Sequence, residues 1–146
     1  MKKQFVTYKI ALKLKELDFD KECLAWFDEN KEIRIAPDVY KKWTSKPLTN
    51  LNIIKVFNID CITAPLYQQV TDWFREKHNI HIEIELTDNT MQFYYQYCIV
   101  DSKNRECHDE DMIDQATRIY NYNERFNTYE EAREQAILKT IELCQK

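Results

Sequence analysis

The chain has 146 residues, a formal net charge of −4 and no glycine, although average usage would give roughly ten glycines. The lack of glycine excludes the Walker A loop, the G-x-G-x-x-G dinucleotide turn and the G-x-S-x-G nucleophile elbow. Hydrophobic residues make up 44% of the chain and charged residues 32%, a balance typical of a soluble folded protein. We therefore expect a single domain that spans residues 1–146.

The cysteines and the N-terminal residues favour a reducing compartment. The five cysteines are odd in number, widely spaced and without a C-x-x-C pair, and Met1–Gln4 leads into a lysine-rich segment. No stretch approaches the roughly 18 apolar residues of a membrane span. We expect a cytoplasmic protein with reduced thiols, no cofactor and no membrane association, with secretion and disulfides as the alternative. The cysteines are Cys23, Cys61, Cys98, Cys107 and Cys144.

The N-terminal part of the chain predicts a helix and then a hairpin. Thr7 is a suitable N-cap for an apolar-periodic helix over residues 8–17. The short apolar run Cys23–Phe27 and the alternating run 32–35 flank a polar turn, which predicts two paired strands. Because the chain has no glycine, we expect Asn30 to take the positive φ angle of that turn.

The middle of the chain predicts an irregular segment followed by a helix. Residues 36–60 are irregular and basic, apart from an expected strand at 52–58. Thr63-Ala64-Pro65 is typical of a helix start, with threonine as the cap and proline in the first turn. Asn79 stands where a helix C-terminal cap is expected and where glycine is usual.

Strict alternation then predicts two long strands. Ile80–Leu86 alternates isoleucine and leucine with charged residues, and Met91–Val100 alternates in the same way after an expected turn at 87–90. Residues 101–116 form an acidic loop in this interpretation. A further strand is expected within 117–123.

The C-terminal segment carries the clearest helix signal. Thr128–Glu131 is a T-x-x-E capping box, and small apolar residues follow at helical spacing. Phe126–Ala132 also shares the order F-x-T-Y-x-x-A with Phe5–Ala11, as two helix starts of one kind. Together the elements predict an α+β fold: a mostly antiparallel sheet of about four to six strands with three packed helices.

Three segments carry a resemblance to a known family. They are Phe5–Tyr8, the block A-P-L-Y-Q-Q-V…W-F-R-E-K over Ala64–Lys77, and the T-Y-E-E-A helix of Phe126–Leu143. They resemble a family of small uncharacterised proteins from Bacteroides-type gut bacteria and their phages, over roughly half of the chain. The resemblance implies a phage or mobile-element context and no catalytic residues. The T-Y-E-E-A helix alone is also similar to the helix that closes HicB-type antitoxin domains.

The tyrosine-rich strand is one candidate binding surface. Tyr94, Tyr95 and Tyr97, next to Phe93, fit either a stacking platform for bases or an aromatic face for a protein partner. Alternation on an ordinary half-buried strand explains the same residues. The neighbouring Glu83 and Glu85 favour a protein partner over nucleic acid.

A basic segment is the second candidate. Lys41, Lys42 and Trp43 interleave charge with an aromatic ring, as nucleic-acid interfaces do. An exposed loop with ordinary lysines is the simpler explanation, because the acidic total charge disfavours nucleic acid.

Metal ligands are weakly indicated. His78 and His81 form an H-x-x-H pair, and Cys107 and His108 begin an acidic run that offers thiolate, imidazole and carboxylate groups. Adjacent ligands seldom point at one ion, so a solvated acidic loop is the simpler interpretation.

The sequence therefore predicts a non-enzymatic protein-interaction module of phage or mobile-element origin, with an unidentified protein partner and no assigned catalytic residue. Two alternatives stay open: a nucleic-acid-binding accessory protein that uses the lysines and tyrosines, and an unrecognised metal-dependent enzyme. The oligomeric state stays open as well.

Overall fold

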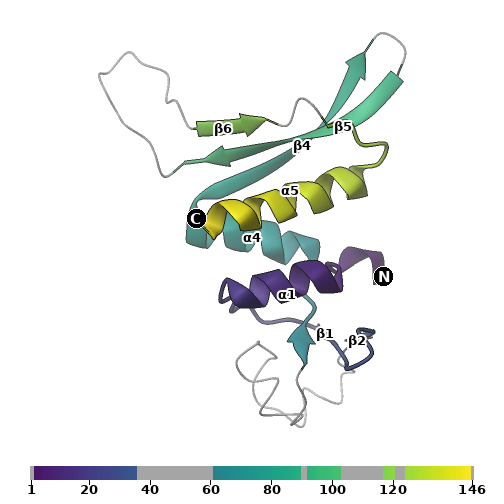
Figure 1. Cartoon of the computed structure of the whole chain (residues 1–146), viewed down its shortest axis with the longest axis vertical. Helices are drawn as coiled ribbons and strands as arrows, with labels where there is room; N and C mark the ends of the chain where they lie inside the picture. The colour runs from purple at the N-terminus through teal and green to yellow at the C-terminus, as the bar shows by residue number, and fades with distance from the viewer. Residues whose placement is uncertain (1, 36–60, 90–91, 103–116, 121–123, 146) are drawn as a thin grey trace. The chain divides into compact units, whose positions relative to one another are not determined.

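The computed structural model describes residues 2–35, 61–89, 92–102, 117–120 and 124–145 (Figure 1). The described residues form three α-helices, one short 3-10 helix at Lys2–Gln4 and six strands in two antiparallel sheets. The α+β class expected from the sequence is confirmed, with the strands divided between two sheets of three. The expected strand at 52–58 lies outside the described residues.

The chain divides into two compact units, Met1–Trp73 and Phe74–Lys146. The division falls within helix α4 (Tyr67–His78). The single domain expected over residues 1–146 stays a prediction.

The first unit begins with the expected helix, α1 (Tyr8–Glu16), which buries Ile10, Ala11 and Leu14. After α1 the chain turns through Asp18, whose φ angle is 59°. The amide of Asp18 donates to the Lys15 carbonyl at 3.2 Å, and the amide of Phe19 donates to the Leu14 carbonyl at 3.0 Å. These two bonds form a Schellman motif, in which an aspartate occupies the left-handed position that glycine usually takes.

The predicted hairpin is present as β1 (Ala25–Phe27) and β2 (Ile33–Ile35). Its positive φ angle belongs to Lys31 (61°), so the assignment to Asn30 was wrong. The Asp28 carboxylate accepts hydrogen bonds from the amides of Asn30 and Glu32, and the Lys31 amide donates to the Asp28 carbonyl. A three-residue hairpin loop of this kind places its left-handed residue third.

Asp28 also joins the turn to β2. Its carboxylate accepts from Arg34 Nε at 2.7 Å, and the amide of Glu32 and the Arg34 guanidinium hold the pKa of Asp28 below its ordinary value. A carboxylate with a lowered pKa contributes most at neutral pH, and its contribution disappears as the pH falls through that lowered pKa.

Helix α4 begins later than the sequence predicts. Thr63, expected as its cap, instead lies in β3 (Ile62–Thr63), which pairs with β1 and is fully buried. The Pro65 carbonyl accepts from the amide of Val6. The helix starts at Tyr67, and the Gln69 side chain accepts from the Leu66 amide at 2.9 Å, which satisfies one of the unpaired amides of the first turn.

The second unit is built on a long hairpin. Strand β4 (Ile80–Asn89) pairs with β5 (Gln92–Asp101) at ten consecutive positions, and β5 pairs on its other side with β6 (Thr117–Tyr120). The turn expected at 87–90 was placed too early, because residues 87–89 continue the strand pairing. The β6 pairing confirms the strand expected within 117–123 for residues 117–120.

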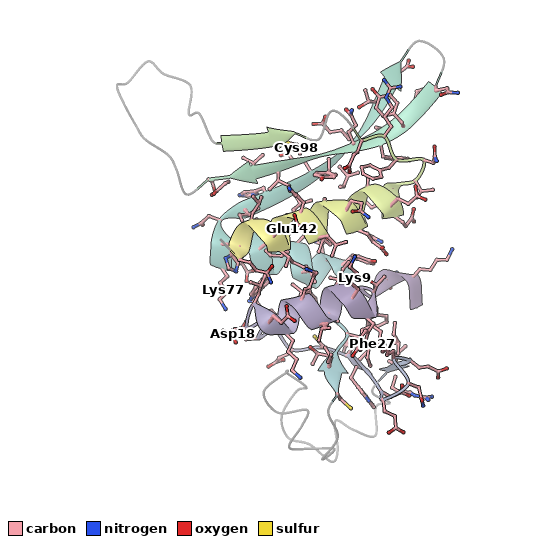
Figure 2. The ribbon with its side chains drawn as sticks, viewed as in Figure 1. Lys9, Asp18, Phe27, Lys77, Cys98 and Glu142 are labelled. Carbon is pink, nitrogen blue, oxygen red and sulfur yellow. The ribbon has the colours of Figure 1, made fainter. Side chains whose placement is uncertain are left out.

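Helix α5 (Tyr129–Cys144) packs along one face of this hairpin (Figure 1). The hydroxyl oxygen of Thr128 accepts from the amide of Glu131 at 3.2 Å, which confirms the predicted cap. Figure 2 labels Cys98 on β5 and Glu142 on α5, with side chains filling the layer between these elements. The buried residues of α5 are Ala132, Ala136, Ile137, Thr140 and Ile141.

The two threonine caps provide a matched test of the helix starts. Thr128 makes its side-chain cap bond, whereas Thr7 occupies the N-cap of α1 without one. We expect Thr128→Ala to lower the free energy of unfolding by about 1 kcal/mol and Thr7→Ala to lower it by less. Urea unfolding followed by circular dichroism measures both, and an equal loss in the two variants would contradict this account.

Asn79 provides a test of backbone strain. It ends α4 with a φ angle of 55°, as predicted, and its carbonyl accepts from the Ser102 amide and hydroxyl. We expect Asn79→Ala to cost about 1 kcal/mol, because alanine is strained in the left-handed region. Asn79→Gly should be tolerated, and the same unfolding assay would count against the argument if alanine and glycine behaved alike.

Candidate functional site

The register of the β4–β5 ladder divides the side chains of the hairpin between two faces. Leu86 stands opposite Tyr95, and Ile84 stands opposite Tyr97. Since directly opposite residues share a face, these side chains lie on one side of the sheet. The ring of Tyr95 meets the ring of Tyr129 at 6.1 Å, so this is the face that α5 covers. The residues of the α5 face are Ile80, Ile82, Ile84, Leu86, Asp88, Phe93, Tyr95, Tyr97 and Ile99.

An aromatic cluster joins the hairpin to the start of α5. Phe126 pairs with Tyr95 through two backbone hydrogen bonds of 2.8 and 3.0 Å, and its ring stacks on Tyr97 at 6.0 Å. Tyr97 is buried and Tyr95 is half-buried. Arg133 lies over the Tyr129 ring at 5.4 Å. Tyr95, through its backbone, and Tyr97, through its ring, thus attach the segment before α5 to the edge of β5.

Beyond this cluster the α5 face becomes exposed. Leu86 is 56% exposed, Phe93 is 72% exposed and Tyr129 is 43% exposed. Phe93 lies diagonally across the strands from Leu86, a spacing that long side chains bridge. Figure 1 shows the far end of the β4–β5 hairpin extending past the start of α5. We call Leu86, Phe93, Tyr95 and Tyr129 the hairpin-tip patch.

The opposite face of the hairpin is acidic. His81, Glu83 and Glu85 alternate along β4 and are all exposed. On β5 the half-buried ring of Tyr94 shares this face, and the Arg125 guanidinium lies 4.8 Å from its centroid. The exposed side chains of β4 on this face are therefore largely acidic, whereas β5 contributes Tyr94 and the buried Cys98 to it.

The structure separates the predicted metal candidates or does not describe them. His78 ends α4 and lies half-buried with its ring 6.0 Å from the ring of Phe74, whereas His81 is exposed on β4. Among the residues that the structure describes, no group of three or more histidine, cysteine or acidic side chains is arranged to hold a metal ion. Cys107 and His108 lie outside these residues.

The basic candidates also lie outside the described part of the chain. They are Lys41, Lys42 and Trp43. Their proposed nucleic-acid role stays a prediction.

Burial makes Cys23 a poor candidate for a nucleophilic thiol. Burial raises the pKa of the Cys23 thiol to about 12, although a hydrogen bond with Thr63 lowers it in part. Its sulfur also contacts the carbonyl of Lys21 at 3.5 Å. A thiol with this pKa stays protonated near neutral pH and is a poor nucleophile.

Comparison with family models, with curated proteins and with solved structures found no match to this chain. Within the described ranges, no helix has the length and apolar character needed to cross a membrane.

Sequence reasoning located the tyrosine strand, with Phe93 beside it, but did not include Leu86 and did not show that Phe93 is exposed. Alternation placed Leu86 on the same face of its strand as Ile82, and Phe93 on the same face of its strand as Ile99. Alternation alone therefore gave no sign that Leu86 and Phe93 are more exposed than the other residues of that face. The capping box at Thr128 could have indicated this exposure, because it marks the start of α5, and strand residues beyond that point are not covered by the helix.

The thiols provide a chemical test of this burial. At pH 8 we expect iodoacetamide to alkylate the half-buried Cys144 well before the buried Cys23, because the reagent reacts with thiolate. Peptide mapping by mass spectrometry reads both sites. In denaturant the two should react at similar rates, and comparable labelling in the folded protein would contradict the burial of Cys23.

Proposed function

We propose that this protein is a non-enzymatic protein-interaction module that binds its partner with the hairpin-tip patch. One observation carries the proposal: Leu86 and Phe93 are exposed on a strand face whose other half is buried under α5. Large apolar side chains grouped at one exposed place are a common sign of a protein-binding site. Aromatic rings fixed by neighbouring contacts also serve as anchors at interfaces.

The setting of the patch supports this role. Tyr95 and Tyr129 hold one another through their ring contact, and Tyr129 also lies beneath the guanidinium of Arg133. Such contacts restrict the rotamers of both rings, so less conformational entropy is lost when they bind a partner. A preformed aromatic rim beside Leu86 and Phe93 suits a protein surface with complementary apolar side chains.

The charges on the hairpin favour a protein over nucleic acid. Glu83 and Glu85 are exposed on one face, and Asp88 stands opposite Phe93 on the other. These carboxylates would repel phosphate groups, whereas nucleic-acid binding depends on neutralising them. The arginines of the two faces, Arg125 and Arg133, are each stacked over a tyrosine ring. The resemblance of Ala64–Lys77 and Phe126–Leu143 to proteins of gut bacteria and their phages supports a phage or mobile-element context.

A matched pair of variants tests the patch. We expect the double variant Leu86→Ser/Phe93→Ser to weaken partner binding about five- to thirty-fold, the effect of removing interface anchors. Leu24→Ser is the control, because Leu24 is also 56% exposed and belongs to the other unit. Exposed substitutions of this kind change stability by about 0.5 kcal/mol or less.

The measurement is capture by the tagged full chain from host-cell lysate, with protein and nucleic acid quantified together. Loss of a protein partner in the double variant but not in Leu24→Ser is the expected result. Equal capture by all three proteins would contradict the patch. Recovery of nucleic acid that dissociates with salt, in place of a protein, would contradict the proposed function itself.

A further inference from the structure

The outer edge of β4 presents backbone groups that are available for pairing. The sheet order is β4-β5-β6, and among the described residues no strand or isolated bridge pairs with the side of β4 away from β5. The ten pairs with β5 run without a bulge, and β4 contains no proline. Bulges and prolines are common devices for blocking an edge strand, and β4 uses neither.

The hydrogen-bond phase of the ladder identifies the groups that point outward. The amide of Ser102 donates to the carbonyl of Asn79, so Asn79 and Ser102 form a hydrogen-bonded pair. In an antiparallel ladder such pairs alternate along each strand. The odd-numbered residues of β4 therefore bond to β5, and the N–H and C=O groups of Ile82, Ile84 and Leu86 point away from it.

The side chains along this edge show a two-sided chemical pattern. Ile82 and Ile84 are half-buried and Leu86 is exposed, all on the α5 face and continuous with the hairpin-tip patch. Glu83 and Glu85 are exposed on the opposite face. A strand that paired with this edge would place every second side chain beside the apolar residues of the α5 face. Its remaining side chains would lie beside the glutamates of the opposite face.

We propose that the β4 edge binds an extended segment of a partner protein, in which basic and apolar residues alternate, by antiparallel strand addition. This inference rests on the proposed function and specifies how the partner binds. The apolar side chains of the segment extend the row formed by Ile82, Ile84 and Leu86. Its lysine or arginine side chains pair with Glu83 and Glu85 across the strands.

A second copy of this chain fits the edge less well. In an antiparallel pairing of two β4 strands centred on Ile84, Glu83 of one copy stands opposite Glu85 of the other. Like charges placed directly opposite each other destabilise a strand pair. The same carboxylates that oppose self-pairing in this register attract a basic segment, so charge favours the basic partner over a second copy.

The test uses the full chain and a synthetic peptide of alternating lysine and valine with blocked ends. We expect the peptide to slow hydrogen exchange at the amides of Ile82, Ile84 and Leu86, as read by NMR. Glu83→Gln/Glu85→Gln should weaken its binding roughly two- to thirty-fold, the range for the loss of two cross-strand charge pairs. Glu16→Gln/Glu29→Gln removes the same charge from other exposed positions and should change the affinity less than about two-fold.

Methylation of the peptide backbone tests the hydrogen bonds directly. Valines on the α5 face stand opposite residues whose amides point outward, so methylating the valine amides should abolish binding. Methylating the lysine amides leaves those bonds intact and should preserve it. An alternating glutamate and valine peptide should not bind.

Three results would overturn the inference: no slowing at the β4 amides, equal weakening in both glutamine double variants, or self-association of the chain through this edge. If the peptide fails while Leu86→Ser/Phe93→Ser still loses its partner, the proposed function stands and strand addition is wrong. If the serine double variant keeps its partner, the proposed function fails whatever the peptide does.

Discussion

Ten consecutive residue pairs hold β4 to β5, and a register shift of one residue would move every side chain of one strand to the opposite face. The observed register places Ile84, Leu86, Tyr95 and Tyr97 on the face of α5. It leaves the glutamates of β4 on the other face. The same register determines which backbone groups of β4 point outward. The apolar patch, the acidic face and the unpaired edge among the described residues thus have one common origin.

Helix α5 covers only part of the β4–β5 hairpin, so the burial of the side chains on its face varies along the strands. Its small residues Ala132 and Ala136 are fully buried, which allows a close approach to the sheet. Phe126 pairs with Tyr95 just before the helix begins, and beyond that point the strands continue without α5 above them. Burial therefore changes from complete at Ile99 to largely lost at Phe93 within a single strand. The hydrophobic effect stabilises one half of the hairpin and leaves apolar side chains on the other half for a partner.

Periodicity predicted the helices and most strands because local spacing determines which residues share a face. It failed where a distant partner decides the outcome. Thr63 resembles a helix cap, but pairing with β1 takes it into a strand. Turn chemistry selected Asn30, yet the loop geometry set by the Asp28 carboxylate places the left-handed residue at Lys31. The tyrosines of the candidate site could be predicted from alternation, whereas the exposure of Phe93 depends on where α5 starts.

The left-handed positions of this chain are occupied by residues other than glycine, which affects both the entropy of the unfolded state and the backbone strain of the folded state. Glycine makes the unfolded chain more flexible, and replacing one at a compatible site stabilises a protein by about 0.4–1 kcal/mol. A chain without glycine has this advantage throughout its length. In return, Asp18, Lys31 and Asn79 each hold a left-handed backbone geometry in the folded protein. Its cost is greatest at Lys31, because aspartate and asparagine tolerate this geometry better than other residues with a side chain. The denatured ensemble of this protein is therefore more restricted than it would be with glycine at these positions, and within the described regions these three residues carry the left-handed geometry of the chain reversals.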